Sequence, residues 1–187
     1  MQALRSDDGE GDNKEASVVQ VSVAVSERVQ GEVMLFIERE YLPVVLKHIR
    51  EAAVSIEACC YEWSWYAGQR MGSVQGVNRE LGYAVKRGVK VRCLMHNEPP
   101  RGHLGKINRR TAHELKVLGC EVKMGGTEKI LHAKFWIFDR EKAIVCTHNI
   151  SNRAANSNAE VGVVVEDPGD ILKLANYYDK LWVEHGR

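Results

Sequence analysis

The feature that most constrains the fold is a helix-like run followed by a strand-like run, a pair that occurs three times in succession. The helix-like runs are YLPVVLKHIREA, VNRELGYAVKRG and NRRTAHELKVLG, and the strand-like runs after them are VSIEACC, Val89–Met95 and Glu121–Met124. The second and third helical runs end at Gly88 and Gly119, as helices commonly do. This alternation predicts an α/β domain with a mixed, mostly parallel sheet flanked by helices.

Further strand-like runs flank this repetition. Val19–Val25 alternates apolar and polar residues, and Gln30-Gly31 can turn the chain into a second strand at Val33–Ile37, which predicts an N-terminal β-hairpin. Near the other end, apolar runs at 131–138, 143–146 and 160–165 predict strands, and a last helix is expected from about residue 167.

Length and composition fit one domain. The chain has 187 residues, of which 44% are hydrophobic, enough for a single core. Residues 1–16 are rich in acidic residues and poor in apolar ones, so we expect a flexible acidic tail ahead of a domain at 17–187. The net charge of +1 gives no overall field that would favour nucleic acid or membrane.

The cysteine pattern and the absence of targeting signals favour a cytoplasmic protein. Five cysteines, none in a C-x2-C pair, predict buried free thiols and no metal site. No apolar run is long enough to span a bilayer, and the N-terminus lacks the basic-then-apolar pattern of a signal peptide. We therefore expect no stable membrane association.

Polar residues of complementary chemistry gather in the last third of the chain. His132 and Lys134 are two apart on an expected strand and so share a face of the sheet. Thr147 and Asn149 share a face at the end of the next strand, and Glu160 starts the strand after it. Imidazole, ammonium, hydroxyl and amide groups together suit an anionic phosphate, on which a histidine can act as nucleophile or proton carrier. Glu160 could hold one imidazole nitrogen and set its tautomer.

This pattern resembles the signature of the phospholipase D superfamily, H-x-K-x4-D followed after six residues by G-S-x-N and later by an acidic residue. The matching residues are His132, Lys134, Asp139, Cys146, Thr147, Asn149 and Glu160. Cys146 stands in place of glycine, which adds bulk beside the phosphate, and Thr147 stands in place of serine but keeps the hydroxyl.

The resemblance implies a phospholipase D-like fold and metal-independent phosphodiester hydrolysis without a cofactor. His132 would form a phosphohistidine, with Lys134, Asn149 and Glu160 as further catalytic residues and Thr147 supporting the phosphate. Asp139 would anchor the local structure, for example by pairing with an imidazole. Because a second histidine must protonate the leaving oxygen and the chain holds one motif, the resemblance also implies a homodimer with a shared site.

Three functions remain open, and an endonuclease acting on DNA or RNA leads. Between Lys86 and Lys116, nine basic residues stand against two glutamates, which indicates either a phosphate track or solvated helix faces. The candidate nucleic-acid-binding residues are Arg101, Lys106, Arg109, Arg110, Trp63 and Trp65, the tryptophans by base stacking or else as core or dimer contacts. The alternatives are a phospholipase or phosphatidyl transferase, and a catalytically silent nucleic-acid-binding module, which Cys146 would favour.

Overall fold

The computed structural model describes residues 33–65, 73–98, 102–126 and 129–185. The expected acidic tail at 1–16 and the first arm of the expected hairpin, Val19–Val25, lie outside these ranges. Its second arm, Val33–Ile37, is a strand, and it pairs with a strand from the far end of the chain.

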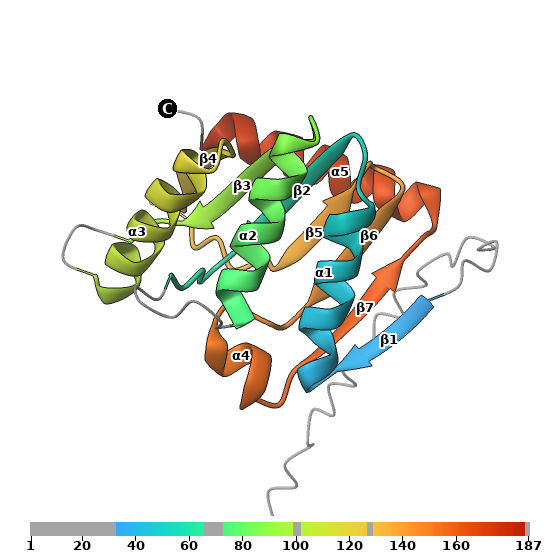
Figure 1. Cartoon of the computed structure of the whole chain (residues 1–187), viewed down its shortest axis with the longest axis horizontal. Coiled ribbons are helices and arrows are strands. Elements are labelled where there is room, and N and C mark those ends of the chain that lie inside the picture. Colours follow the sequence, from blue (N-terminus) through green and yellow to red (C-terminus); the bar gives the residue numbers. More distant parts are fainter. Residues whose placement is uncertain (1–32, 66–72, 99–101, 127–128, 186–187) are drawn as a thin grey trace, which may run out of the picture.

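Seven strands form one sheet, in the order β1-β7-β6-β5-β2-β3-β4 (Figure 1). The strands are β1 (Val33–Ile37), β2 (Ser55–Cys60), β3 (Lys90–His96), β4 (Glu121–Gly125), β5 (Phe135–Phe138), β6 (Lys142–Cys146) and β7 (Val161–Val165). The helices are α1 (Tyr41–Glu51), α2 (Ser73–Lys86), α3 (His103–Val117), α4 (Asn152–Asn156) and α5 (Pro168–Glu184), and a single 3-10 turn covers Glu38–Glu40.

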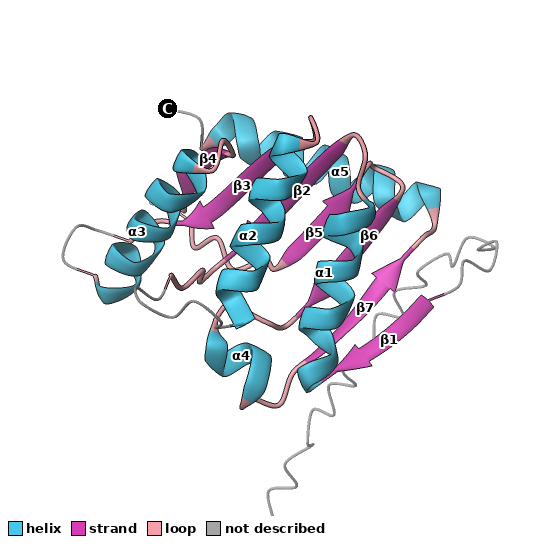
Figure 2. Cartoon of the chain, viewed as in Figure 1, coloured by secondary structure: helices cyan, strands magenta, loops and turns pink. Residues whose placement is uncertain are grey.

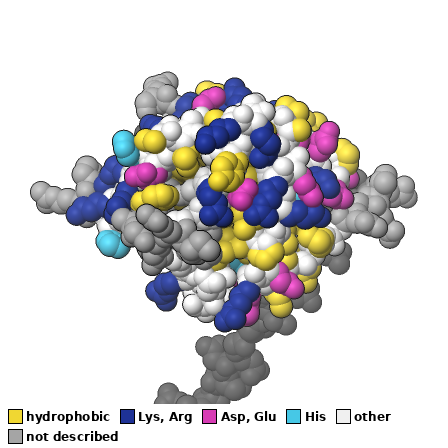
Figure 3. Space-filling model, in the orientation of Figure 1, with side chains coloured by type: hydrophobic (Ala, Val, Ile, Leu, Met, Phe, Trp, Pro, Cys, Tyr) yellow, Lys and Arg dark blue, Asp and Glu magenta, His cyan; other side chains and the backbone are white. Residues whose placement is uncertain are grey.

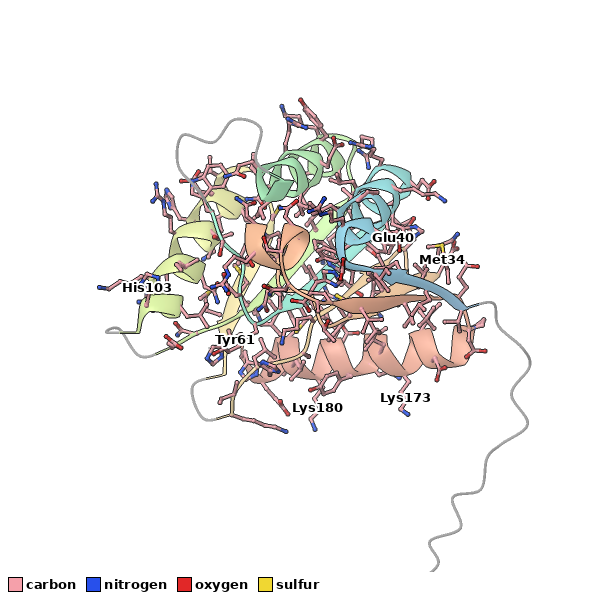
Figure 4. The ribbon with its side chains drawn as sticks, turned by 90° about the horizontal axis from the view of Figure 1, so that it is seen from below. Met34, Glu40, Tyr61, His103, Lys173 and Lys180 are labelled. Carbon is pink, nitrogen blue, oxygen red and sulfur yellow. The ribbon has the colours of Figure 1, made fainter. Side chains whose placement is uncertain are left out.

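The helices cover the two faces of the sheet unequally. Helices α1, α2 and α3 lie across one face, and α5 runs along the other, as Figures 2 and 4 show from two directions. One apolar cluster packs between the sheet and α1 to α3, with Val45, Val77 and Leu115 fully buried. A second cluster packs α5 against the sheet through Ile137 and Tyr178. The α/β class with a mixed sheet flanked by helices is thus confirmed.

The expected predominance of parallel pairing is wrong for one half of the sheet. Parallel pairing joins β2 to β3 and β3 to β4, where helices provide the crossovers. The other four pairs, β1–β7, β7–β6, β6–β5 and β5–β2, are antiparallel. A tight turn at 139–141 reverses the chain between β5 and β6, and only an antiparallel pair can be joined so briefly.

The helix ends follow the local sequence. Helix α2 ends before Gly88, which has a φ of 93°, a conformation that glycine adopts without strain. Helix α5 begins after Asp167, whose carboxylate accepts a hydrogen bond from the backbone nitrogen of Asp170, with Pro168 in the first turn. No helix among the described residues is long and apolar enough to cross a bilayer.

The strand expected at 131–138 is shorter than its apolar run. It begins at Phe135, so His132 and Lys134 precede β5 rather than lie on it. Here the carbonyl of His132 accepts a hydrogen bond from Lys134 Nζ at 2.8 Å, while the carbonyl of Lys134 accepts one from the backbone nitrogen of Cys146 at 3.2 Å.

Candidate active site

His132 and Lys134 are in direct contact where the chain enters β5. Lys134 Nζ lies 3.2 Å from His132 Nδ1 and 3.1 Å from His132 Nε2. A nitrogen that is nearly equidistant from both ring nitrogens would collide with the carbon between them if it lay in the ring plane. The ammonium therefore lies over the face of the imidazole and leaves the in-plane lone pair free. The His132 side chain itself is exposed.

Lys134, unlike His132, is buried. The residue is 9% exposed, and burial lowers the pKa of its ammonium, against the opposing influence of Cys60, Cys146 and Glu160. A partly desolvated ammonium interacts more strongly with an anion than one in water does. The pair thus combines an accessible nucleophile with a fixed positive charge, which suits attack on a phosphate.

The ring of Tyr61 lies against the His132–Lys134 pair. Its centroid lies 4.9 Å from that of His132 and 5.0 Å from that of His96, and Lys134 Nζ lies 5.4 Å from the same centroid. Tyr61 follows β2, and His96 ends β3, so both stand at the carboxyl ends of parallel strands (Figure 4). The segments that leave these two strands are where the sequence predicts ligand-binding residues, but no motif marks Tyr61 or His96 within them as part of the site.

Asn108, on α3, holds these two strand ends together. Its Nδ2 donates to the carbonyls of Tyr61 and His96, at 2.8 Å each, and its Oδ1 accepts from the backbone nitrogen of Trp63 at 2.9 Å. The side chain is fully buried, and all three of these hydrogen bonds go to backbone atoms. The position of Tyr61 beside His132 therefore depends on the fold and not on an exposed loop.

The hydroxyl and carboxylate expected at the site are bonded to each other. Thr147 Oγ1 donates to Glu160, whose second oxygen accepts from Asn158 Nδ2 at 3.0 Å. The structure therefore places the Glu160 carboxylate against Thr147, where the sequence suggested an imidazole. Asn149 Oδ1 accepts from the backbone nitrogen of Glu62 at 3.3 Å, which leaves its amide nitrogen as the end able to donate to a ligand.

A pocket of about 430 Å³ joins part of the predicted set. It is lined by His132, Ala133, Lys134, Phe135, Val145, Cys146, Thr147, Leu174 and Tyr177. Three predicted residues, His132, Lys134 and Thr147, thus share one cavity, and Glu160 contacts it through Thr147. Asn149 is on the same segment as Thr147 but not on the pocket wall.

Cys146 lies on the pocket wall, with its thiol turned toward backbone. Its Sγ is 3.9 Å from the carbonyl oxygen of Lys134 and 3.7 Å from that of His148. Burial raises the pKa of this thiol to about 12, so it is uncharged at neutral pH. Its neighbour on β7 is Gly162, where a Cβ would come within 2.7 Å of the Cβ of Cys146. The small residue on β7 makes room for its two cross-strand neighbours, the ring of Phe36 on β1, which a Cβ would meet first, and Cys146 on β6.

Asp139 lies at the far end of β5 from Lys134. Its carboxylate accepts three backbone hydrogen bonds, of 2.8 to 2.9 Å, from Ala53, Val54 and Ser55. Burial acts to raise the pKa of this carboxyl, but the three bonds outweigh it and the pKa is lowered. Asp139 anchors the turn before β2, and the structure does not bring it together with the phosphate-binding candidates.

The other candidate residues divide into buried and accessible ones. Trp63 is fully buried and donates from Nε1 to Asn78, so it cannot stack on a base as suggested. Arg109 bonds Asn97 Oδ1 at 3.2 Å. Lys106 and Arg110 are exposed on α3, Trp65 is half-buried, and Arg101 lies outside the described residues.

Two other findings limit the chemistry. His148, inside the motif, is fully buried and stacks on Tyr41 at 4.3 Å between ring centroids, so it has a structural position. Within the described ranges, no three His, Cys, Asp or Glu side chains are grouped closely enough to hold a metal ion.

Comparisons with known proteins identify the family of the chain. A family model described as "Cardiolipin synthase, PLD-like domain" matches residues 45–182. A curated protein named phospholipase D, from Rickettsia bellii, is 31% identical over 100 residues, which are 54% of this chain and 45% of that protein. The chain thus matches less than half the length of this curated relative.

Two solved structures share the fold. Nuc from Salmonella typhimurium, described as a phospholipase D family member, has a TM-score of 0.68 at 21% identity, covering 82% of this chain and 95% of that one. NucT from Helicobacter pylori has a TM-score of 0.69 at 21% identity, covering 83% and 98%.

Proposed function

Because the chain belongs to the phospholipase D superfamily, we propose that it is a phosphodiesterase that cuts DNA or RNA internally through a phosphohistidine on His132. The observation that carries this proposal is the exposed imidazole of His132 with the buried ammonium of Lys134 over its face. That arrangement leaves a ring nitrogen free to approach phosphorus while a fixed charge neutralises the phosphate oxygens. No metal or cofactor enters the proposed steps.

The reaction has two displacements at phosphorus. In the first, a His132 ring nitrogen forms a bond to phosphorus, the bond to the leaving oxygen breaks, and the protonated imidazole of the partner's His132 gives that oxygen its proton. In the second, the same partner imidazole takes a proton from water, whose oxygen attacks phosphorus and releases His132. Lys134 and the Asn149 amide nitrogen stabilise the charge on the phosphate, and Glu160 orients the Thr147 hydroxyl.

A homodimer is part of the proposal, because one chain supplies one motif histidine. Its support is an apolar sheet face on the α5 side, formed by Val33, Leu35, Ile37, Val145, Val161 and Val163. Five of these six are between 41% and 64% exposed, and exposed apolar side chains that lie together can form an interaction surface. Val145 belongs both to this face and to the candidate pocket. A second copy on the apolar sheet face would therefore stand beside His132.

The preference for nucleic acid rests on charge. Lys106 and Arg110 are exposed on α3, within the basic stretch of the sequence, and polyanions bind such surfaces. Most of this charge lies on the helical side of the sheet rather than around the apolar sheet face.

A phospholipase is the second candidate, and a specific observation favours it. Phe135, Leu174 and Tyr177 give the pocket apolar walls, which an acyl chain could contact. The apolar sheet face beside the pocket would then meet lipid rather than a second copy of the chain.

One experiment separates these functions. The purified chain is incubated in EDTA with labelled single-stranded DNA, duplex DNA, RNA and a phosphatidylcholine analogue, beside His132→Asn and a matched control, His113→Asn, which changes an exposed histidine on α3. We expect cleavage of a nucleic acid that is lost in His132→Asn alone. Turnover of the lipid alone would establish the phospholipase. Binding of nucleic acid without turnover of any substrate would establish the silent nucleic-acid-binding module.

A further inference from the structure

A second cavity, of about 450 Å³, lies on the helical side of the molecule, between α2 and α3. This α2–α3 groove is lined by Trp65, Gln75, Asn78, Arg79, Gly82, Tyr83, Lys86, Val117 and Leu118. Neither the family signature nor the proposed chemistry uses any of these side chains. Lys and Arg side chains are spread over the face of the molecule on which α2 and α3 lie (Figure 3).

Asn78 gives the groove an unpartnered polar group. The residue is 1% exposed, and its Oδ1 accepts from Trp63 Nε1 at 2.9 Å. Its Nδ2 is buried and has no hydrogen-bond partner among the described residues. Leaving a buried amide donor unpaired is costly, and because this atom is closed to solvent it is a cost to the fold rather than a contact for a ligand.

The accessible walls of the groove are aromatic and cationic. Arg79, Tyr83 and Lys86 share one side of α2, and Tyr83 is 48% exposed with Lys86 Nζ 5.8 Å from its ring centroid. Trp65 is half-buried and belongs to the same lining. The lining contains two cations and no carboxylate. These walls therefore suit a ligand that has both a planar ring and negative charge.

The α2–α3 groove is connected to the candidate active site through the segment after β2. Tyr61, at the start of this segment, contacts His132, and Trp65 lines the groove. The segment is held by hydrogen bonds of 2.9 Å between Ser64 and Ile150 and between Ile150 and Glu62. The four steps of protein chain from Tyr61 to Trp65 span at most about 14 Å, even when fully extended. A nucleic-acid strand bound at His132 can therefore extend to the groove.

We propose that the α2–α3 groove binds an unpaired stretch of the nucleic-acid substrate, with a base against Trp65 and Tyr83 and the backbone phosphates beside Arg79 and Lys86. A base inside a duplex is paired and stacked and cannot enter a side pocket, so the groove selects single strands. This inference rests on the proposed nuclease function and names the form of its substrate.

The test measures DNA binding by a variant that cannot turn over its substrate. A labelled, unstructured DNA oligonucleotide is titrated into His132→Asn by fluorescence anisotropy, and the titration is repeated with Trp65→Leu, with Arg79→Gln plus Lys86→Gln, and with Lys47→Gln. Lys47 is the matched control, an exposed lysine on α1 outside the groove. Melting curves establish that each variant is folded, and the charge variant changes only exposed side chains.

We expect Trp65→Leu to weaken binding about tenfold, the loss of one stacked base. The double charge variant should bind more weakly. The slope of the logarithm of its binding constant against the logarithm of salt concentration should be smaller in magnitude by about 1.4. Lys47→Gln should bind as the parent does. Unchanged binding in both groove variants, or duplex bound as tightly as single strand through the same residues, would overturn the inference. Failure of the wild-type chain to cleave any diester would count against the proposed function instead, because the binding assay needs no turnover.

Discussion

The ring of Tyr61 meets the imidazole of His132 at 4.9 Å between centroids and at an angle of 58°. The contact joins the end of β2 to the segment that enters β5, two parts of the chain some seventy residues apart. Because Asn108 fixes the backbone of Tyr61, the phenol ring limits where the His132 imidazole can turn. The candidate nucleophile is thus positioned by the parallel half of the sheet as well as by its own motif.

Replacing Tyr61 by leucine should lower kcat. The substitution removes the ring beside His132 and Lys134, and a cation–π contact contributes about 0.5 to 2 kcal/mol, which corresponds to about two- to thirtyfold in rate. Tyr61→Phe keeps the ring and should retain most of the activity. Steady-state kinetics on a short diester substrate measure both. Equal losses in the two variants would assign the effect to the hydroxyl and contradict the role of the ring.

Activity should show a second, steeper alkaline decline where Lys134 loses its proton, in addition to the decline set by the proton that the leaving oxygen needs. Burial lowers the pKa of Lys134, so its ammonium loses a proton, and with it the charge that holds the phosphate, below the usual lysine range. An arginine stays charged, so Lys134→Arg should move this decline to higher pH even if its maximum rate is lower. The measurement is kcat/KM against pH for both proteins. A second decline at the same pH in Lys134→Arg would show that a group other than Lys134 controls it.

Stability should fall on acidification because of buried histidines. Burial lowers the pKa of His48, His96 and His148, so the unfolded chain binds protons more readily than the folded one as pH drops through the histidine range. The free energy of unfolding therefore keeps its full value above the pH range in which histidines titrate, and it decreases as the pH falls through that range.

His148→Phe tests this linkage at one site. Phenylalanine keeps an aromatic ring against Tyr41 but cannot titrate. Urea unfolding at pH 7.5 and 5.5 should give a smaller loss of stability on acidification in the variant than in the parent, whatever its stability at the higher pH. An equal loss in both proteins would mean that His148 does not contribute.

Leu35→Glu should abolish dimers and activity together. Leu35 is 64% exposed in the middle of the apolar sheet face, where a carboxylate would have to lose its hydration in an interface. Val54→Glu is the control, since Val54 is 67% exposed in the turn before β2, outside this face. Light scattering gives the oligomeric state of each variant. A dimeric and active Leu35→Glu protein would exclude this face as the interface.

Local signals in the sequence predicted the elements better than their pairing. Gly88 and Asp167 mark a helix end and a helix start that the structure reproduces, because capping depends on a few neighbouring residues. The pairing direction of β5 and β6 depends on the brevity of the turn at 139–141, which the helix–strand alternation does not contain. Before β5, the carbonyl of His132 bonds the side chain of Lys134, a contact that an apolar run in the sequence does not reveal.

The candidate site shows a similar division. The spacing of His132, Lys134 and Thr147 is enough to predict that they share a pocket, since they lie where the chain enters β5 and where it leaves the neighbouring β6. Tyr61 is far from the motif in sequence, so the motif does not predict its place in the site. It reaches the site because β2 pairs with β5. The motif also does not distinguish Trp63, fully buried, from Trp65, which lines the α2–α3 groove.

The shared site is tested most directly by a mixed dimer of one wild-type chain and one His132→Asn chain. With a single composite site, such a dimer keeps one imidazole, so a phosphohistidine can form but the leaving oxygen receives no proton. Its rate per dimer, measured on the purified tagged heterodimer, should fall by at least the roughly 10² to 10⁴ typical of general acid catalysis. A rate near one half of wild type would mean two independent sites and would contradict the account.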